Sequence, residues 1–145
     1  MERKAREIRD TISCDSDVQG LDVVAFSGKN YRRAIEFGEW CVAFLNHGER
    51  FAAPTYIERH NESDEVFVLV SGEATLLIGE SRREVRMECG KIYNVRKGTW
   101  HQIVTAPCAR CLIVENADTG AVNSERREIE GASQNSVELT ERNTP

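Results

Sequence analysis

The sequence predicts an all-β protein, an antiparallel sandwich or barrel around a single core. Short runs rich in apolar and β-branched residues follow one another between positions 21 and 116, at intervals of about ten residues, with Gly, Asn or Pro between them. This region has no helix-length segment whose apolar residues repeat every 3.6 positions, which argues against alternating strands and helices. The chain of 145 residues is long enough for one domain with one sizeable core.

The expected strands follow in order along the chain. Each is a run of mainly apolar residues bounded by turn-forming residues. Strands are expected at 21–26, 40–45, 53–60, 65–70, 74–79, 84–87, 91–95, 101–104 and 110–115. Gly72, Gly90 and Gly98 lie in the breaks, where glycine tolerates the backbone angles of tight turns.

Polar segments flank the predicted β domain. Residues 1–20 form a charged and polar N-terminal extension, and residues 21–123 form the β domain. Residues 124–145 carry Ser, Glu, Arg, Asn and Thr with only scattered apolar residues. Such a composition buries little surface, so we expect a polar, partly disordered tail.

The charge and the hydropathy pattern exclude several kinds of partner. Lys and Arg number 19 against 24 Asp and Glu, a net charge of -5, whereas nucleic-acid binding needs a basic stripe. No apolar run approaches the roughly 20 residues of a membrane span. The charged first nine residues lack the apolar stretch of a signal peptide. We therefore expect a cytoplasmic protein with no nucleic-acid or membrane partner.

The five cysteines predict neither a disulfide framework nor a zinc site. Their number is odd and they are scattered along the chain. Cys108 and Cys111 form a C-x-x-C pair, but no second pair at suitable spacing completes a zinc site. The pair also runs into a predicted strand, whereas a redox pair opens a helix. We expect these cysteines to be structural.

Two of the three histidines lie where side chains from several strands could meet. His60 ends one predicted strand, and Glu58 projects to the same face because side chains alternate along a strand. Glu65 opens the next strand on the face of its core residues, where a carboxylate is costly unless it is paired or binds a metal. His101 starts a further strand, whereas His47 lies in a polar turn and is expected in a loop.

These residues fall into two motifs that resemble those of the cupin superfamily. The first motif runs from Glu58 through His60 and Glu65, then six residues to Gly72. The second runs from Gly90 through Arg96-Lys97-Gly98-Thr99-Trp100-His101 to Thr105. The resemblance covers about residues 40–116. It implies a jelly-roll antiparallel β-barrel, the double-stranded β-helix, and a divalent metal held by two histidines of the first motif, its glutamate and the histidine of the second.

The sequence departs from the family pattern at four positions. Glu58 replaces the first histidine of the first motif, and Ala52 stands where that motif begins with glycine. Arg96 replaces the proline of the second motif, and Thr105 replaces its final asparagine. A carboxylate oxygen is as suitable a ligand for Mn²⁺ and Fe²⁺ as an imidazole nitrogen. The resemblance therefore implies His60, Glu65 and His101 as metal ligands, and the carboxylate of Glu58 could fill the fourth place of the expected site.

Other readings of these four residues stay open. Glu58 could pair with Arg96 or Arg59, and His60 could be a satisfied core histidine without a metal, as in cupins that have lost their ligands. The metals considered are Fe, Mn, Ni and Zn, and no organic cofactor is expected. Four further residues are expected near the cavity, and we name them as pocket candidates: Tyr56, Phe67, Arg96 and Trp100.

The expected function is that of a small-molecule metalloenzyme or metal-binding protein, with isomerase, lyase and dioxygenase chemistry all open. One alternative is a metal-free ligand-binding or sensing module, and another is a sugar-epimerase-like cupin in which a histidine paired with a carboxylate acts as base. The expected partner is a small-molecule ligand or substrate. A homodimer is also expected, because the run 40–45 is apolar on both faces and cupins are commonly dimers.

Overall fold

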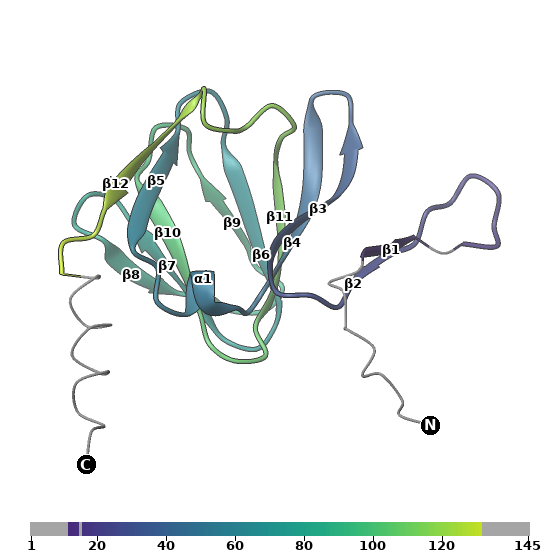
Figure 1. The fold of residues 1–145 in the computed structure, drawn as a ribbon, viewed down its shortest axis with the longest axis horizontal. Coiled ribbons are helices and arrows are strands. Elements are labelled where there is room, and N and C mark those ends of the chain that lie inside the picture. Colours follow the sequence, from purple (N-terminus) through teal and green to yellow (C-terminus); the bar gives the residue numbers. More distant parts are fainter. Residues whose placement is uncertain (1–11, 15, 132–145) are drawn as a thin grey trace, which may run out of the picture.

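The computed structural model describes residues 12–14 and 16–131, which contain twelve strands and one short helix (Figure 1). The elements are β1 (Ile12–Cys14), β2 (Val24–Phe26), β3 (Asn30–Phe37), β4 (Trp40–Asn46), α1 (Glu49–Ala52), β5 (Tyr56–His60), β6 (Glu65–Ser71), β7 (Ala74–Ile78), β8 (Arg83–Arg86), β9 (Ile92–Val95), β10 (His101–Thr105), β11 (Arg110–Asn116) and β12 (Ser124–Glu128). The predicted all-β fold class is confirmed.

Two five-stranded antiparallel sheets form the body of the fold. One has the strand order β12-β5-β10-β7-β8, and the other has the order β3-β4-β11-β6-β9. The two sheets face each other, while the small β1–β2 hairpin extends to one side (Figure 1). Most neighbours in the sheets are distant in sequence, as β5 and β10 are, which is the crossing pattern of a jelly roll.

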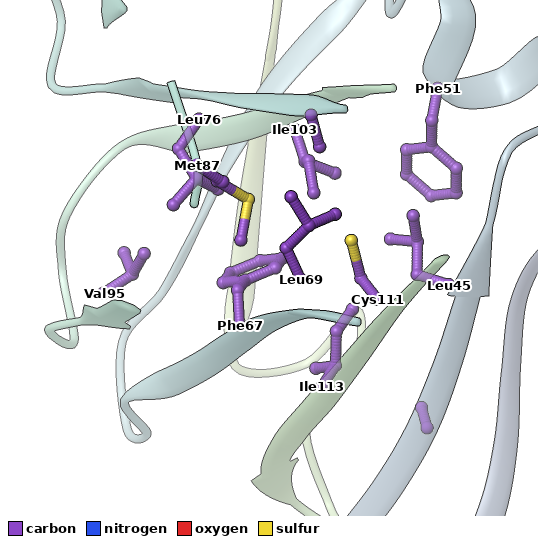
Figure 2. Close-up of a cluster of buried hydrophobic side chains, with 12 residues drawn as sticks. Leu45, Phe51, Phe67, Leu69, Leu76, Met87, Val95, Ile103, Cys111 and Ile113 are labelled. Carbon is purple, nitrogen blue, oxygen red and sulfur yellow. The ribbon is translucent and has the colours of Figure 1, made fainter. Parts of the chain in front are cut away.

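The core lies between the two sheets and follows the alternation of each strand. Phe67 and Leu69 of β6 are buried, while Val66 and Val68, which alternate with them, are only partly covered. Figure 2 shows these side chains meeting Leu76 and Ile103 of the opposite sheet. Phe51, the buried residue of α1, extends the cluster toward Leu45. A short helix is thereby held against the core by one aromatic ring.

Three strands, β1, β3 and β12, arise where the sequence predicts none. β3 is rich in charged residues and forms one edge of its sheet, so its strand pattern is weak in the sequence. β12 lies in the segment assigned to the polar tail, and it pairs with β5 along its whole length. Backbone hydrogen bonds make β12 a strand even though its sequence, Ser-Glu-Arg-Arg-Glu, has no apolar residue. The remaining parts of the predicted extension and tail, 1–11, 15 and 132–145, lie outside the described residues.

The motif glycine Gly72 forms the turn between β6 and β7 at a close approach of two backbones. Its φ angle is +78°, in the region that side chains disfavour. A Cβ atom there would lie 2.7 Å from both the Cα of Ala109 and the carbonyl oxygen of Cys108. Glycine is therefore required at position 72 for two reasons: the positive φ angle, and the lack of room for a Cβ atom.

Within the part of the chain that the structure describes, no helix has the length and apolar character needed to cross a membrane.

Candidate functional site

Three predicted metal ligands meet in the interior, each from a different strand. His60 ends β5, Glu65 begins β6 and His101 begins β10. The residues are 7%, 5% and 2% exposed. The Nε2 atoms of His60 and His101 each lie 2.8 Å from the same oxygen, Oε2 of Glu65. We call this arrangement the His60–Glu65–His101 cluster.

The outer nitrogens of the two rings also have partners. Nδ1 of His60 lies 2.7 Å from the hydroxyl oxygen of Ser124, which belongs to β12. Nδ1 of His101 lies 2.9 Å from the carbonyl oxygen of Thr99. Because a carbonyl only accepts hydrogen bonds, Nδ1 of His101 carries a proton and donates it. A neutral His101 then presents the lone pair of Nε2 to a carboxylate oxygen, so this position attracts a cation, either a proton or a metal ion.

The pKa values of the three cluster residues reflect a competition between burial, which disfavours charge, and the interactions among the three side chains. Burial is the largest single influence and disfavours the charged form of each histidine, but the hydrogen bond to Glu65 and the negative charge of that carboxylate together raise the pKa of both His60 and His101. Burial likewise opposes ionisation of Glu65, yet the hydrogen bonds from His101 and His60 lower the pKa of Glu65. Two imidazoles whose Nε2 atoms converge on one ionised carboxylate suit a divalent metal, and the Nδ1 bond to a backbone carbonyl is typical of metal-binding histidines.

Glu58 lies beside the cluster but has another partner. Its Oε2 is 3.2 Å from Nε of Arg126, a residue of β12. This partner differs from the two arginines considered in the sequence analysis, Arg59 and Arg96. Ligand atoms of Glu58, His60 and His101 nonetheless all lie within 4.8 Å of one another. Glu58 therefore has the position of a ligand and also a competing ion pair.

Glu115 is a buried acid that the sequence analysis did not single out. Ligand atoms of Glu115, His60 and Glu65 lie within 4.8 Å of one another. The hydroxyl of Tyr31 donates a hydrogen bond of 2.6 Å to Glu115. Burial, followed by the nearby charge of Glu65, raises the pKa of Glu115 to about 6. The pKa of Tyr31 is raised well above its usual value by burial and by its bond to Glu115.

A cavity of about 480 Å³ joins these groups, a volume within the usual range for small-molecule sites. Its buried end holds His60, Glu65 and His101, with Glu58 and Glu115 beside them. The apolar part of its wall consists of Leu45, Phe51, Phe67, Ile103 and Ile113. Its exposed members are Arg50, Gly120, Ala121 and Arg126, which mark the mouth.

Of the four pocket candidates, Phe67 borders this cavity and the other three lie elsewhere. Trp100 precedes His101, so strand alternation turns it to the opposite face, where the guanidinium groups of Arg59 and Arg127 cover its ring at 4.7 and 4.5 Å. Arg96 is exposed in the turn before β10. Tyr56 lies behind the mouth, in contact with two arginines of the lining rather than with the cavity itself.

Tyr31 and Glu115 were not among the predicted site residues. The sequence signals for them are weak because the residues that they contact come from distant segments. Tyr31 lies in a strand that the apolar pattern does not reveal, and Glu115 is the last but one residue of β11, on its buried face. Glu115 could have been found by the reasoning applied to Glu65, since it shares the inward face of Cys111 and Ile113.

Solved structures with low sequence identity share this fold. No family model and no curated protein match the sequence. Pac13, a nucleoside dehydratase, matches with a TM-score of 0.56 and 8% identity over 92% of this chain and 98% of its own. KdgF from Halomonas sp. matches with a TM-score of 0.51 and 10% identity over 74% and 87%. A protein from Planctomyces limnophilus matches with a TM-score of 0.52 and 12% identity over 86% and 96%.

The matches to Pac13 and KdgF agree with the two sequence motifs. The first motif places His60 and Glu65 at the junction of β5 and β6, and the second places His101 at the start of β10. The chain therefore has the fold of the cupin superfamily.

Proposed function

We propose that this protein is a small-molecule enzyme that holds a divalent metal in its cavity, with His60, Glu65 and His101 as ligands and Glu58 as a fourth. The observation that carries the proposal is the convergence of two imidazole Nε2 atoms on one buried carboxylate oxygen, at 2.8 Å each. A divalent metal at this position supplies Lewis-acid activation of a bound carbonyl, carboxylate or water.

The surrounding residues have separable roles in this proposal. Thr99 and Ser124 fix the ring orientations of His101 and His60 through their Nδ1 atoms. Phe67 and its apolar neighbours exclude water from one side of a small molecule bound in the cavity. Glu115, bonded to Tyr31, is a carboxyl group able to hold or move a proton at the same end of the cavity.

These roles favour proton-transfer chemistry, of the isomerase or lyase class, over dioxygenation. Two acid–base groups, Glu115 and Tyr31, border the cavity beside the proposed metal. The dehydratase Pac13, which shares the fold, has also been solved with uridine. A first substrate screen therefore includes nucleosides alongside small sugars and sugar acids.

The first test is the metal content of the full chain, purified without chelator or affinity metal and then offered Fe²⁺, Mn²⁺, Ni²⁺ and Zn²⁺ separately. We expect near-stoichiometric binding of at least one metal to the wild type. His101→Gln and Glu65→Gln are expected to lower the affinity by about 10-fold or more, because each removes a ligand.

His47→Gln is the matched control, because His47 bonds Thr105 away from the cluster and Gln keeps a hydrogen-bonding group there. Circular dichroism and thermal unfolding identify variants that fail to fold. Absence of every metal from the folded wild type would refute the proposal, as would wild-type stoichiometry in both ligand variants.

A second candidate is the metal-free module, favoured by the ion pair between Glu58 and Arg126. The epimerase-like alternative needs a histidine paired with a carboxylate, an arrangement that His60 and His101 both have with Glu65. A metal-free wild type that binds a sugar with Glu65-dependent affinity would support these readings in place of the metalloenzyme.

We further propose that two chains associate through the outer face of the sheet with the order β3-β4-β11-β6-β9, called here the β3–β9 sheet after its two edge strands. Two rows of facing residues cross this sheet: Ile35, Val42, Val114, Val66 and Asn94 in one, and Arg32, Phe44, Leu112, Val68 and Ile92 in the other. The first row contains no charge, and the second carries one only at its β3 end, where Arg32 faces Phe44. A second copy of the same largely apolar face is therefore the matching partner. The cytoplasmic location, and the absence of nucleic-acid and membrane partners, stay predictions.

A further inference from the structure

The mouth of the cavity is basic, in contrast to its acidic and histidine-rich interior. Three arginines border the cavity: Arg33, Arg50 and Arg126. Arg50 belongs to α1 and Arg126 to β12, and both are exposed to solvent. The sequence separates them by more than seventy positions, so only the fold brings them to one opening.

One side chain, Tyr56 of β5, holds both of these arginines. Its hydroxyl oxygen accepts hydrogen bonds from Nε and Nη2 of Arg50, at 3.1 and 2.7 Å. The guanidinium carbon of Arg126 lies 4.4 Å from the centre of the Tyr56 ring. The tyrosine thus fixes one guanidinium through its hydroxyl and the other through its π face.

The three arginines differ in how their charges are matched. Arg33 bonds the carbonyl oxygens of Ala117 and Thr119 and pairs with Glu36. Arg126 pairs with Glu58. Arg50 makes no ion pair with a carboxylate among the described residues, since its contacts there are with neutral aromatic side chains.

Arg50 also keeps unused hydrogen-bond donors. A guanidinium has five N–H groups, and the two bonds to Tyr56 use one on Nε and one on Nη2. The remaining donors form a rigid planar fork suited to two oxygens of one oxyanion. A fixed cation with free donors at the mouth of a ligand-sized cavity is a binding position for a negatively charged group.

We propose that Arg50 and Arg126, positioned by Tyr56, bind the oxyanion of a small-molecule ligand, a carboxylate or a phosphate, while the rest of that ligand extends toward His60 and His101. This inference rests on the proposed function insofar as the cavity takes a small molecule, and it names the chemical class of that molecule. Arg50 and Arg126 are binding residues, and Tyr56 is a positioning residue.

The test compares binding of four probes to the full chain at constant ionic strength and pH: inorganic phosphate, glucose, glucuronate and glucose 6-phosphate. The readout is the arginine Nε–Hε NMR signals together with backbone amide shifts. The three sugars share a ring and differ at one carbon, so they separate carboxylate from phosphate recognition. We expect saturable shifts at Arg50 with at least one anionic probe and none with glucose.

Single substitutions then test which residues are responsible for anion binding. Arg50→Gln is expected to weaken binding of the anionic probe by about tenfold or more, and Arg50→Lys is expected to recover part of the loss by restoring the charge without the fork. Tyr56→Phe removes the acceptor for Arg50 but keeps the ring under Arg126, so it should weaken binding while leaving the melting temperature close to wild type. Arg83→Gln, an exposed arginine on β8 outside the cavity, is the matched control and should change nothing.

The outcomes separate this inference from the proposed metal site. Metal content in Arg50→Gln should equal that of the wild type. Anion binding that depends on Arg50 in a protein without metal would support the inference and refute the metalloenzyme. A metal-loaded protein whose Arg50 signals respond to no anionic probe, or whose anion affinity is the same in Arg50→Gln, would overturn the inference and leave the metal site standing.

Discussion

Glu115 is a buried carboxyl group of the cavity whose pKa is shifted toward neutral pH. Tyr31 donates a hydrogen bond to it, which favours the ionised form, yet burial and the negative charge of Glu65 dominate. Its pKa is therefore about 6, above the ordinary 4.5. A carboxyl group with such a pKa holds its proton through mildly acidic conditions and releases it near neutrality.

This shift fixes the sign of a pH effect on stability. Because the folded-state pKa of Glu115 is raised, its contribution to stability is fully present below the unfolded pKa of 4.5 and is lost as the pH rises through about 6. The loss amounts to about 2 kcal/mol. Glu115→Gln keeps the acceptor for Tyr31 but does not titrate, so its stability relative to wild type should rise by about that amount between about pH 4 and pH 8.

Urea unfolding of the metal-free protein at several pH values measures this difference. Glu84→Gln, on the exposed strand β8, controls for the loss of one negative charge. Equal pH profiles for Glu115→Gln and wild type would show that Glu115 does not titrate in this range.

At the scale of elements, the β6–β7 turn explains why a motif glycine is needed. Gly72 and Gly79 both have positive φ angles, +78° and +80°. A Cβ atom added at Gly72 would lie within 3 Å of backbone atoms, whereas one added at Gly79 would face open space. The pair therefore separates the conformational cost of an added methyl group from its steric cost.

We expect Gly79→Ala to destabilise the fold by about 1–2 kcal/mol, the cost of a left-handed backbone for an L residue. Gly72→Ala should cost about 3 kcal/mol or more, because the methyl group would also overlap the backbone of Ala109. Chemical denaturation of both variants measures the two values. Equal losses would mean that the β10–β11 turn moves aside without strain.

The elements also show what the sequence could predict. The spacing of His60, Glu65 and His101 predicts their convergence, because strand ends and turn lengths are local properties that the motifs encode. β12 escaped prediction because its polar residues give no apolar alternation, and its partner strand lies more than sixty residues earlier. For the same reason Ser124 and Arg126 could not be assigned to the site from sequence alone.

At the scale of the whole molecule, the apolar outer face of the β3–β9 sheet leads to a prediction about assembly. Val114 lies near the middle of this face, between Val42 and Val66, and 37% of its surface is exposed. A glutamate there would place a charge in the proposed interface, where it would lose its water on association.

Val114→Glu should therefore convert a dimer into a monomer without unfolding it, as measured by light scattering coupled to size-exclusion chromatography. Val122→Glu is the control, since Val122 is fully exposed in the loop before β12 and outside the sheet. A wild-type mass equal to that of one chain would refute the dimer, as would a dimer that persists in folded Val114→Glu.

The strand β12 has a consequence for the order of events during synthesis. Domains begin to fold from the N-terminus while the chain is being made, at about 5–20 residues per second. His60, Glu65 and His101 leave the ribosome before Ser124 and Arg126 do. A nascent chain therefore gathers the interior cluster first, and gains the clamp on His60 and the second arginine of the mouth only when β12 is added. The polar clamp on His60 and the proposed oxyanion site are thus completed only after the strands that form the core of the two sheets have been made.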